Sequence, residues 1–175
     1  MRARYFLTAA IVGGLVEFAW GSVSHVALVL PGTEPRSFAD SNAVVQVVKA
    51  NAAENGIYMD GRGLFAAVAF RPDLGQKFES LTRPLINQLL IEIAVAAVLA
   101  WVLLRMPGMT PFQTGILFAI IGVAAAIEEL LPMQNWYGFP RSSSAAETID
   151  LVVGWLLLGL VLGAVRNRMA PAPAN

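Results

Sequence analysis

Four long apolar runs, separated by polar stretches, dominate the pattern along this 175-residue chain. A helix needs about 20 apolar residues to cross a hydrocarbon core of about 30 Å, and each run comes near that length. The pattern therefore predicts four membrane-spanning helices, at residues 6–30, 85–104, 112–131 and 149–165.

Prolines and charged residues mark the ends of these runs. Pro132 is expected to stop the third helix, and Asp150 is expected to lie where the fourth one opens. The short link at residues 106–111 holds two prolines and a glycine, which predicts a tight turn between antiparallel helices. The first run is longer than the core of a cleaved signal peptide and contains Glu17, so a retained span is favoured.

The segment at residues 31–83 is too long to be a mere connection between the first two spans. Asp40 and Ser41 are candidate caps of a short helix, which Asn55 and the glycine after it would stop. Residues 57–70 read as strand, turn and strand. The segment therefore predicts a small extracytoplasmic α+β insert, which is expected to dock on the helices because it buries little by itself.

Composition agrees with a membrane protein. The chain is 57% hydrophobic and 14% charged, with a mean hydropathy of +0.62, which is too apolar for a soluble domain of this length. The lack of cysteine excludes disulfides, zinc–thiolate sites and c-type haem attachment. The net charge is zero, so the basic footprint of a nucleic-acid-binding protein is missing, and the expected environment is a lipid bilayer.

The charges are distributed unevenly between the two ends of the predicted spans. Cytoplasmic flanks of membrane helices carry an excess of Lys and Arg, and both termini and the 106–111 link have purely basic neighbours. Both termini are therefore expected in the cytoplasm. The basic residues concerned are Arg2, Arg4, Arg105, Arg166 and Arg168.

Ionisable residues within the spans are the main functional candidates, because each costs roughly 2.5 to 3.5 kcal/mol near the bilayer centre unless it finds a partner or a wet cavity. Glu17 lies near the middle of the first span. It shares a helix face with small residues and Ser24, and His25 lies beside that face. All four predicted helices bring such groups to the middle and outer half. A polar pocket is therefore expected, open to the outer face and sealed below by apolar packing, with the candidate residues Glu17, Ser24, His25, Gln88, Glu92, Glu129 and Asp150.

Three interpretations of this pocket stay open. The groups either hydrogen-bond one another and set helix register, bind a proton or cation, or act as acid and base on a lipid-soluble substrate. A metal site is not expected, because the chain has one histidine and no Glu-x-x-His motif of di-iron bundles. No cofactor motif is evident.

Two further features predict contacts outside the pocket. Gly159 and Gly163 form a GxxxG pair roughly opposite Asp150, so they are expected to face a neighbouring protein. Trp136 and Tyr137 are typical of the aromatic belt at a membrane interface, with a ligand-gripping role as the alternative.

Three segments together resemble a group of small bacterial four-span inner-membrane proteins. They are residues 20–25 (WGSVSH), residues 135–140 (NWYGFP), and Asp150 followed by Gly154 and Trp155. The resemblance covers most of the chain. It implies a bacterial inner membrane and carries no activity.

The favoured function is a non-enzymatic accessory or assembly subunit of a membrane complex, with a membrane protein or a second copy of the chain as partner. The alternative is a binding protein or carrier for a proton, a cation or an amphipathic ligand, although no broken helix or inverted repeat marks a transport site. A second alternative is an intramembrane enzyme with Glu17, His25 or Glu92 as acid or base.

Overall fold

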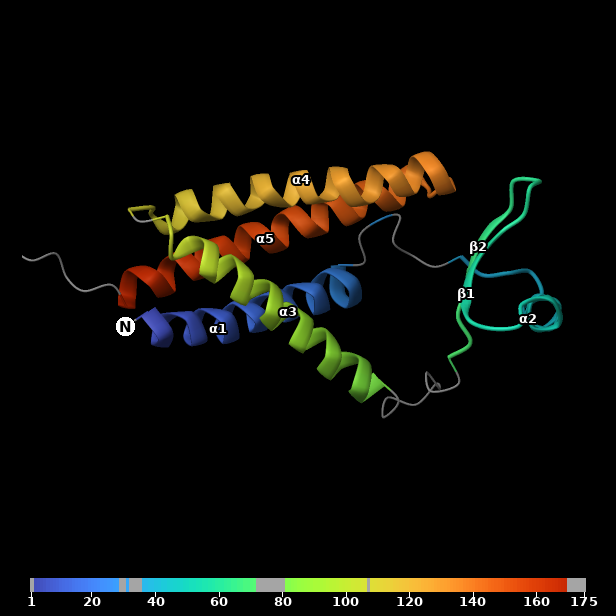
Figure 1. Ribbon diagram of the computed structural model, residues 1–175, viewed down its shortest axis with the longest axis horizontal. Coiled ribbons are helices and arrows are strands. Elements are labelled where there is room, and N and C mark those ends of the chain that lie inside the picture. The colour runs from blue at the N-terminus through green and yellow to red at the C-terminus, as the bar shows by residue number, and fades with distance from the viewer. Residues whose placement is uncertain (1, 29–30, 32–35, 72–80, 107, 170–175) are drawn as a thin grey trace, which may run out of the picture. The chain divides into compact units, whose positions relative to one another are not determined.

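The computed structural model describes residues 2–28, 31, 36–71, 81–106 and 108–169. The chain folds as two compact units, a helical unit (Met1–Thr33 with Arg83–Asn175) and an insert unit (Glu34–Thr82). The helical unit contains α1 (Arg2–Ser22), the π-helix η1 (Val23–Leu28), α3 (Thr82–Leu103), α4 (Pro111–Tyr137) and α5 (Arg141–Met169), as Figure 1 shows. The insert unit contains α2 (Ser41–Asn51), β1 (Gly56–Met59) and β2 (Phe65–Val68).

Four helices in the described residues are long and apolar enough to cross a membrane, namely Ala3–Leu28, Thr82–Leu103, Pro111–Tyr137 and Arg141–Met169. The four apolar helices predicted from the sequence are therefore confirmed, and by length and composition they suggest a multi-pass membrane protein. The predicted end of the first span at residues 29–30 lies outside the described residues, as do residues 32–35 and 72–80 of the predicted insert.

The prediction that Pro132 ends the third helix is wrong. Pro132 lies inside α4, which continues to Tyr137. A proline removes one backbone donor, and membrane helices tolerate this where the freed groups find other partners. The helix ends instead at Gly138, whose φ of 71° lies in the left-handed region that glycine adopts without strain.

The fourth apolar helix also begins earlier than expected, at Arg141. Asp150 therefore lies in its third turn and does not open it. The stretch before Asp150 is rich in serine and threonine, which is typical of a loop. Here the Ser144 and Thr148 hydroxyls donate to carbonyls one turn back, at 3.4 Å to Pro140 O and 2.8 Å to Ser144 O, so their hydrogen bonds are made within the helix.

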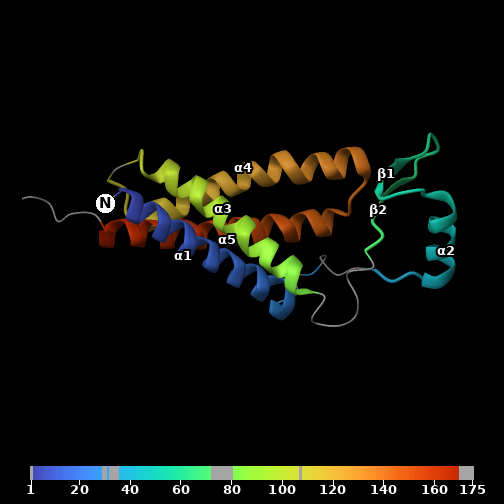
Figure 2. The same ribbon diagram turned by 60° about the horizontal axis from the view of Figure 1, so that its bottom comes forward.

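The helical unit has two ends that differ in content. Figures 1 and 2 both show the start of α1, the α3–α4 connection and the end of α5 at one end, the basal end. The opposite, apical end holds η1, the start of α3 and the α4–α5 connection. Buried apolar side chains from all four helices form a core in the basal half: Tyr5, Ala9, Ala96, Leu99, Ala100, Leu103, Phe118, Leu158 and Leu162.

Glycines bring the helices close together. A Cβ added at Gly159 would lie 2.6 Å from Thr114 O of α4, and one at Gly163 would lie 2.7 Å from Pro111 Cα. α1 and α3 cross where a Cβ on Gly14 would lie 2.7 Å from Ile93 Cα. Figure 1 shows α3 running obliquely, so that its apical half diverges from α4 and α5.

Arg166 ties the basal ends of the helices together. Its guanidinium donates to Met106 O at 2.7 Å, to Leu103 O at 3.5 Å and to Met109 O. These carbonyls belong to the end of α3 and the connection to α4, where a helix leaves acceptors without intrahelical partners. One side chain of α5 therefore satisfies the polar backbone of the α3–α4 turn.

The insert unit has the predicted elements. β1 and β2 pair antiparallel in the register Gly56–Val68 to Met59–Phe65, which confirms the strand, turn and strand. Asp60 stabilises the turn by accepting from the backbone N–H of Leu64 at 2.8 Å. Asp40 caps α2 through the N–H of Ala43 at 2.9 Å, but α2 ends at Asn51, before the stop expected from Asn55.

Candidate functional site: an acidic cavity in the apical half

A cavity of about 730 Å³ lies in the apical half of the helical unit. Its walls come from α1 with η1, α3, α4 and α5, and they continue into the basal core at Val95 and Trp155. Six of the seven residues expected from the sequence to line a polar pocket do so: Glu17, His25, Gln88, Glu92, Glu129 and Asp150.

Glu17 is the most deeply placed acidic group of this cavity, with only 9% of its surface exposed. The absence of a side chain at Gly154 makes room for it, because a Cβ at that position would lie 2.9 Å from Glu17 Oε2. Glu17 Oε1 is buried and has no hydrogen-bond partner among the described residues. An acceptor left in this condition is costly, and such groups often mark places where a ligand binds.

Trp20 joins α1 to α5 one turn above Glu17. Its indole N–H donates to the backbone carbonyl of Asp150 at 3.1 Å, and its ring also packs where a Cβ on Gly154 would stand, 3.1 Å from Trp20 Cδ1. This bond holds the segment of α5 that carries Asp150 against the cavity. Asp150 is half-buried, and its Oδ1 atom has no partner in the described part of the chain.

The apical end of α1 changes from α-helix to the π-helix η1, and the change shapes the Ser24–His25 corner. Ser24 is buried and donates to Gly21 O at 3.2 Å. Its hydroxyl also lies 2.9 Å from His25 Nδ1. Ser24 does not line the cavity. It supports His25, which does. Single turns of π-helix are rare and occur often at functional sites.

α3 and α4 supply the remaining polar wall. Gln88 Nε2 donates to Glu92 Oε1 at 2.5 Å, one helical turn apart, as expected from their spacing. Glu129 of α4 lines the cavity while its side chain stays exposed, and its neighbour Glu128 is exposed outside the lining.

The cavity is acidic, and part of its wall is aromatic. Four carboxylates line it, from Glu17, Glu92, Glu129 and Asp150, and of the described residues around it none is lysine or arginine. Phe18, Trp20 and Trp155 add aromatic surface. Both tryptophans belong to the segments on which the expected resemblance to small four-span proteins was based.

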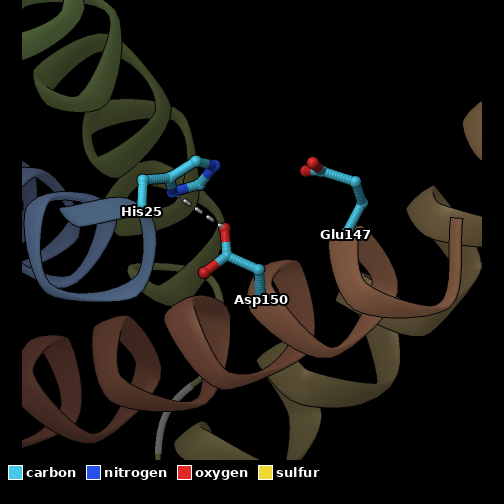
Figure 3. A group of neighbouring side chains, drawn as sticks. All are labelled: His25, Glu147 and Asp150. Carbon is cyan, nitrogen blue, oxygen red and sulfur yellow. Dashed lines mark ion pairs between the residues drawn. The ribbon is translucent and has the colours of Figure 1, made fainter. Parts of the chain in front are cut away.

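One acidic residue near the cavity was missed by the sequence interpretation. Glu147 offers an oxygen that forms a group with atoms of His25 and Asp150, all within 4.8 Å of one another. Figure 3 shows the three side chains converging from η1 and α5. Glu147 was overlooked because the fourth helix was expected to start at residue 149. In a helix that starts at Arg141, Glu147 and Asp150 are three apart and share a face.

Of the residues expected at an external interface, the glycine pair is buried and the aromatic pair is exposed. Gly159 and Gly163 are buried against α4 of the same chain, so the pair does not supply the contact with a neighbouring protein that was expected of it. Trp136 and Tyr137 lie in the last turn of α4 and are exposed, at 75% and 39%. They do not line the cavity.

Comparison with protein-family models, with curated proteins and with solved structures found no match to this chain. The function is therefore inferred from the geometry and chemistry of the cavity.

Proposed function

We propose that this protein binds a lipophilic organic cation in the apical cavity, as a multi-pass protein of a bacterial inner membrane. The observation that carries the proposal is the cavity itself, with about 730 Å³ of space, four carboxylates, aromatic walls and no lysine or arginine among the described lining.

The volume supports an organic ligand. Sites for drug-sized molecules occupy about 300 to 1,000 Å³, and a proton or a bare metal ion needs far less. Eight of the sixteen lining residues are aliphatic or aromatic, including Phe18, Trp20, Leu151 and Trp155, so half of the lining suits an apolar body.

The charge supports a cation. Carboxylates at membrane depth need compensation, and the unpartnered Oε1 of Glu17 is not compensated by the described residues. Aromatic faces such as those of Trp20 and Trp155 attract organic cations through the ring quadrupole, an effect that strengthens when water is excluded. An amphipathic cation satisfies both kinds of wall at once.

The distribution of basic residues orients the protein. Arg4, Arg105, Arg166 and Arg168 lie at or near the basal end, and the positive-inside rule therefore supports a cytoplasmic position of that end and of both termini. The cavity then opens towards the outer face. The four helices form a membrane bundle in this arrangement, and the resemblance to small bacterial four-span proteins supports the inner membrane.

We favour ligand binding over the role of an accessory subunit. That role rested partly on an outward glycine pair, and Gly159 and Gly163 are used inside the chain. The cavity, in contrast, gathers the intramembrane polar residues in one place.

Tetraphenylphosphonium tests the proposal, because tetraphenylborate is a probe of nearly the same size and shape with the opposite charge. Isothermal titration of the detergent-purified protein should give saturable binding of about one tetraphenylphosphonium ion per chain. Tetraphenylborate, which meets the same apolar walls, should bind at least about tenfold more weakly because the carboxylates repel it. Equal binding of the two ions, or no saturable binding of the cation, would remove the proposal.

A further inference from the structure

We propose that His25, Glu147 and Asp150 form a binding site for a divalent transition-metal ion, with zinc as the best fit, at the apical rim of the cavity. This site overlaps the organic-cation site but uses a different set of residues. Glu147 does not line the cavity, whereas His25 and Asp150 belong to both. The metal site does not depend on the organic-cation function.

The three ligand atoms are already close to one another. One atom from each side chain lies within 4.8 Å of the other two. Bonds of about 2.0 to 2.1 Å in a tetrahedral zinc site would place ligand atoms roughly 3.3 Å apart. The cluster therefore needs a contraction of up to about 1.5 Å, which side-chain rotation supplies because the His25 side chain is 52% exposed.

The hydrogen bonds of His25 prepare one ring nitrogen for a metal. Nδ1 lies 3.1 Å from Gly21 O, and a carbonyl only accepts, so Nδ1 carries the proton in this bond. The Nε2 lone pair is then available. Figure 3 shows the far side of the ring turned towards the Glu147 carboxylate. Metal-binding histidines commonly donate their second ring N–H to a backbone carbonyl in this way, which fixes the tautomer and the ring orientation.

The π-helix creates this arrangement. Ser24 and His25 both lie in η1, and both side chains form a hydrogen bond with Gly21 O. Gly21 lies near the end of α1, where the α-helix changes to the wider π-helical turn. Ser24 is buried and stabilises the turn through its hydrogen bond to Gly21 O, while His25 projects towards α5.

Carboxylate oxygens without partners also favour a cation in this part of the helical unit. Glu17 lines the same cavity as His25 and Asp150, is only 9% exposed, and has an Oε1 atom that no described group bonds. Asp150 Oδ1 is also buried without a partner in the described residues. A positive charge held between His25 and Asp150 would directly compensate the Asp150 carboxylate, whose Oδ1 has no partner among the described residues.

The donor set selects the class of metal. One imidazole with two carboxylates suits zinc and related transition metals, whereas magnesium and calcium prefer oxygen ligands alone. Three protein ligands leave a fourth position, which water or a substrate group fills at this half-exposed rim. The absence of a Glu-x-x-His motif, which argued against a metal in the sequence, excludes only the di-iron type of bundle site.

Zinc titration of the purified, EDTA-treated protein tests the site directly. We expect one equivalent of Zn²⁺ per chain by isothermal titration, and a visible absorption band on Co²⁺ substitution. Glu147→Gln keeps the size of the side chain and should weaken Zn²⁺ binding at least about tenfold. His25→Ala should abolish the Co²⁺ band. Glu128→Gln removes an exposed carboxylate outside the cluster and should leave zinc binding unchanged.

The outcomes separate the two proposals. Loss of zinc binding in both cluster variants, with intact binding in Glu128→Gln, supports the site. Absent stoichiometric binding, or equal binding in wild type and both variants, overturns it. Zinc binding without tetraphenylphosphonium binding removes only the organic-cation function, and the reverse result removes only the metal site. Because Glu147 is not buried and His25 is exposed, neither variant opens a hole in the core, and gel filtration checks that each remains folded.

Discussion

The two halves of the helical unit are built from the same four helices and treat polar groups in opposite ways. In the basal half, the Arg166 guanidinium donates to three backbone carbonyls, and small residues let the helices touch. In the apical half, Glu17 Oε1 and Asp150 Oδ1 are buried without partners in the described part of the protein. The basal half thus satisfies its charged group internally, whereas the apical half leaves carboxylates available to a ligand.

Tyr5 is an exception to this division. Its hydroxyl lies in the basal core and is also unpartnered among the described residues. A neutral hydroxyl costs much less to bury than a carboxylate, so one such group is compatible with a basal half whose role is structural. The difference between the halves lies in the ionisable groups.

The largest effect is expected where the basal packing is tightest. Gly159→Ala places a Cβ 2.6 Å from Thr114 O, so α4 and α5 must separate. Overpacking of this kind costs typically 1 to 3 kcal/mol, and we expect about 3 kcal/mol because the neighbour is backbone. Unfolding by SDS titration measures it.

Gly21→Ala is the matched control in the apical half. A Cβ there meets nothing within 4 Å among the described atoms, so the free energy of unfolding should change by less than about 1 kcal/mol. Similar losses in the two variants would contradict the distinction between a packed basal half and an open apical half.

The second largest effect on stability is expected at the Arg166 hydrogen bonds of the basal half. Arg166→Gln removes the donors that reach Leu103, Met106 and Met109, and should lower the free energy of unfolding by about 2 kcal/mol. Proteolysis in the 104–110 connection should become faster. Arg168→Gln alters an exposed arginine two residues further on and should be near neutral; an equal loss in that variant would show that charge alone is responsible.

Glu17→Gln should give the reverse pattern. It removes a charge from the cavity wall but keeps the shape of the side chain, so tetraphenylphosphonium should bind about tenfold more weakly, equivalent to about 1.4 kcal/mol. The free energy of unfolding should not fall, because no partner in the described residues loses a bond to Oε1. Glu128→Gln should bind like the wild type. A Glu17→Gln protein that unfolds readily and binds normally would assign Glu17 a structural role.

The smallest effect on ligand binding is expected at the Trp20 hydrogen bond between α1 and α5. Trp20→Phe removes the bond to Asp150 O but keeps an aromatic ring, at a cost of about 1 kcal/mol in tetraphenylphosphonium binding. Trp136→Phe changes a tryptophan that is 75% exposed and outside the cavity, and should have no effect on titration. Equal affinities of the two variants for tetraphenylphosphonium would mean that Trp20 does not position the α5 wall of the cavity.

The sequence predicted the apical residues well because intramembrane charges are rare and their helix faces follow from periodicity. Glu17, Gln88, Glu92 and Asp150 could thus be assigned to one pocket from their spacing alone. The ends of the helices were harder to predict from the sequence. Pro132 resembles a stop, and the run before Asp150 resembles a loop, because both rules describe local preference and tertiary packing overrides them.

Two features of the site had no local signal. The π-helix that turns His25 towards α5 depends on an extra residue in one turn, which periodicity does not reveal. Glu147 became a candidate only once α5 was known to begin at Arg141. The orientation of Gly159 and Gly163 was also undetermined, since a small-residue pair serves equally well inside one chain or between two.

Cysteine accessibility tests the contrast between the halves most directly, because the chain has no cysteine of its own. Gly21→Cys places a thiol in the apical cavity, and Ala100→Cys places one in the basal core, where Ala100 is 0% exposed. In intact cells, a cationic methanethiosulfonate reagent should modify the apical thiol faster than an anionic one, and tetraphenylphosphonium should protect it. The basal thiol should not react with either. Equal reaction of the two thiols, or faster reaction of the apical thiol with the anionic reagent, would contradict an acidic, outward-open cavity above a sealed core.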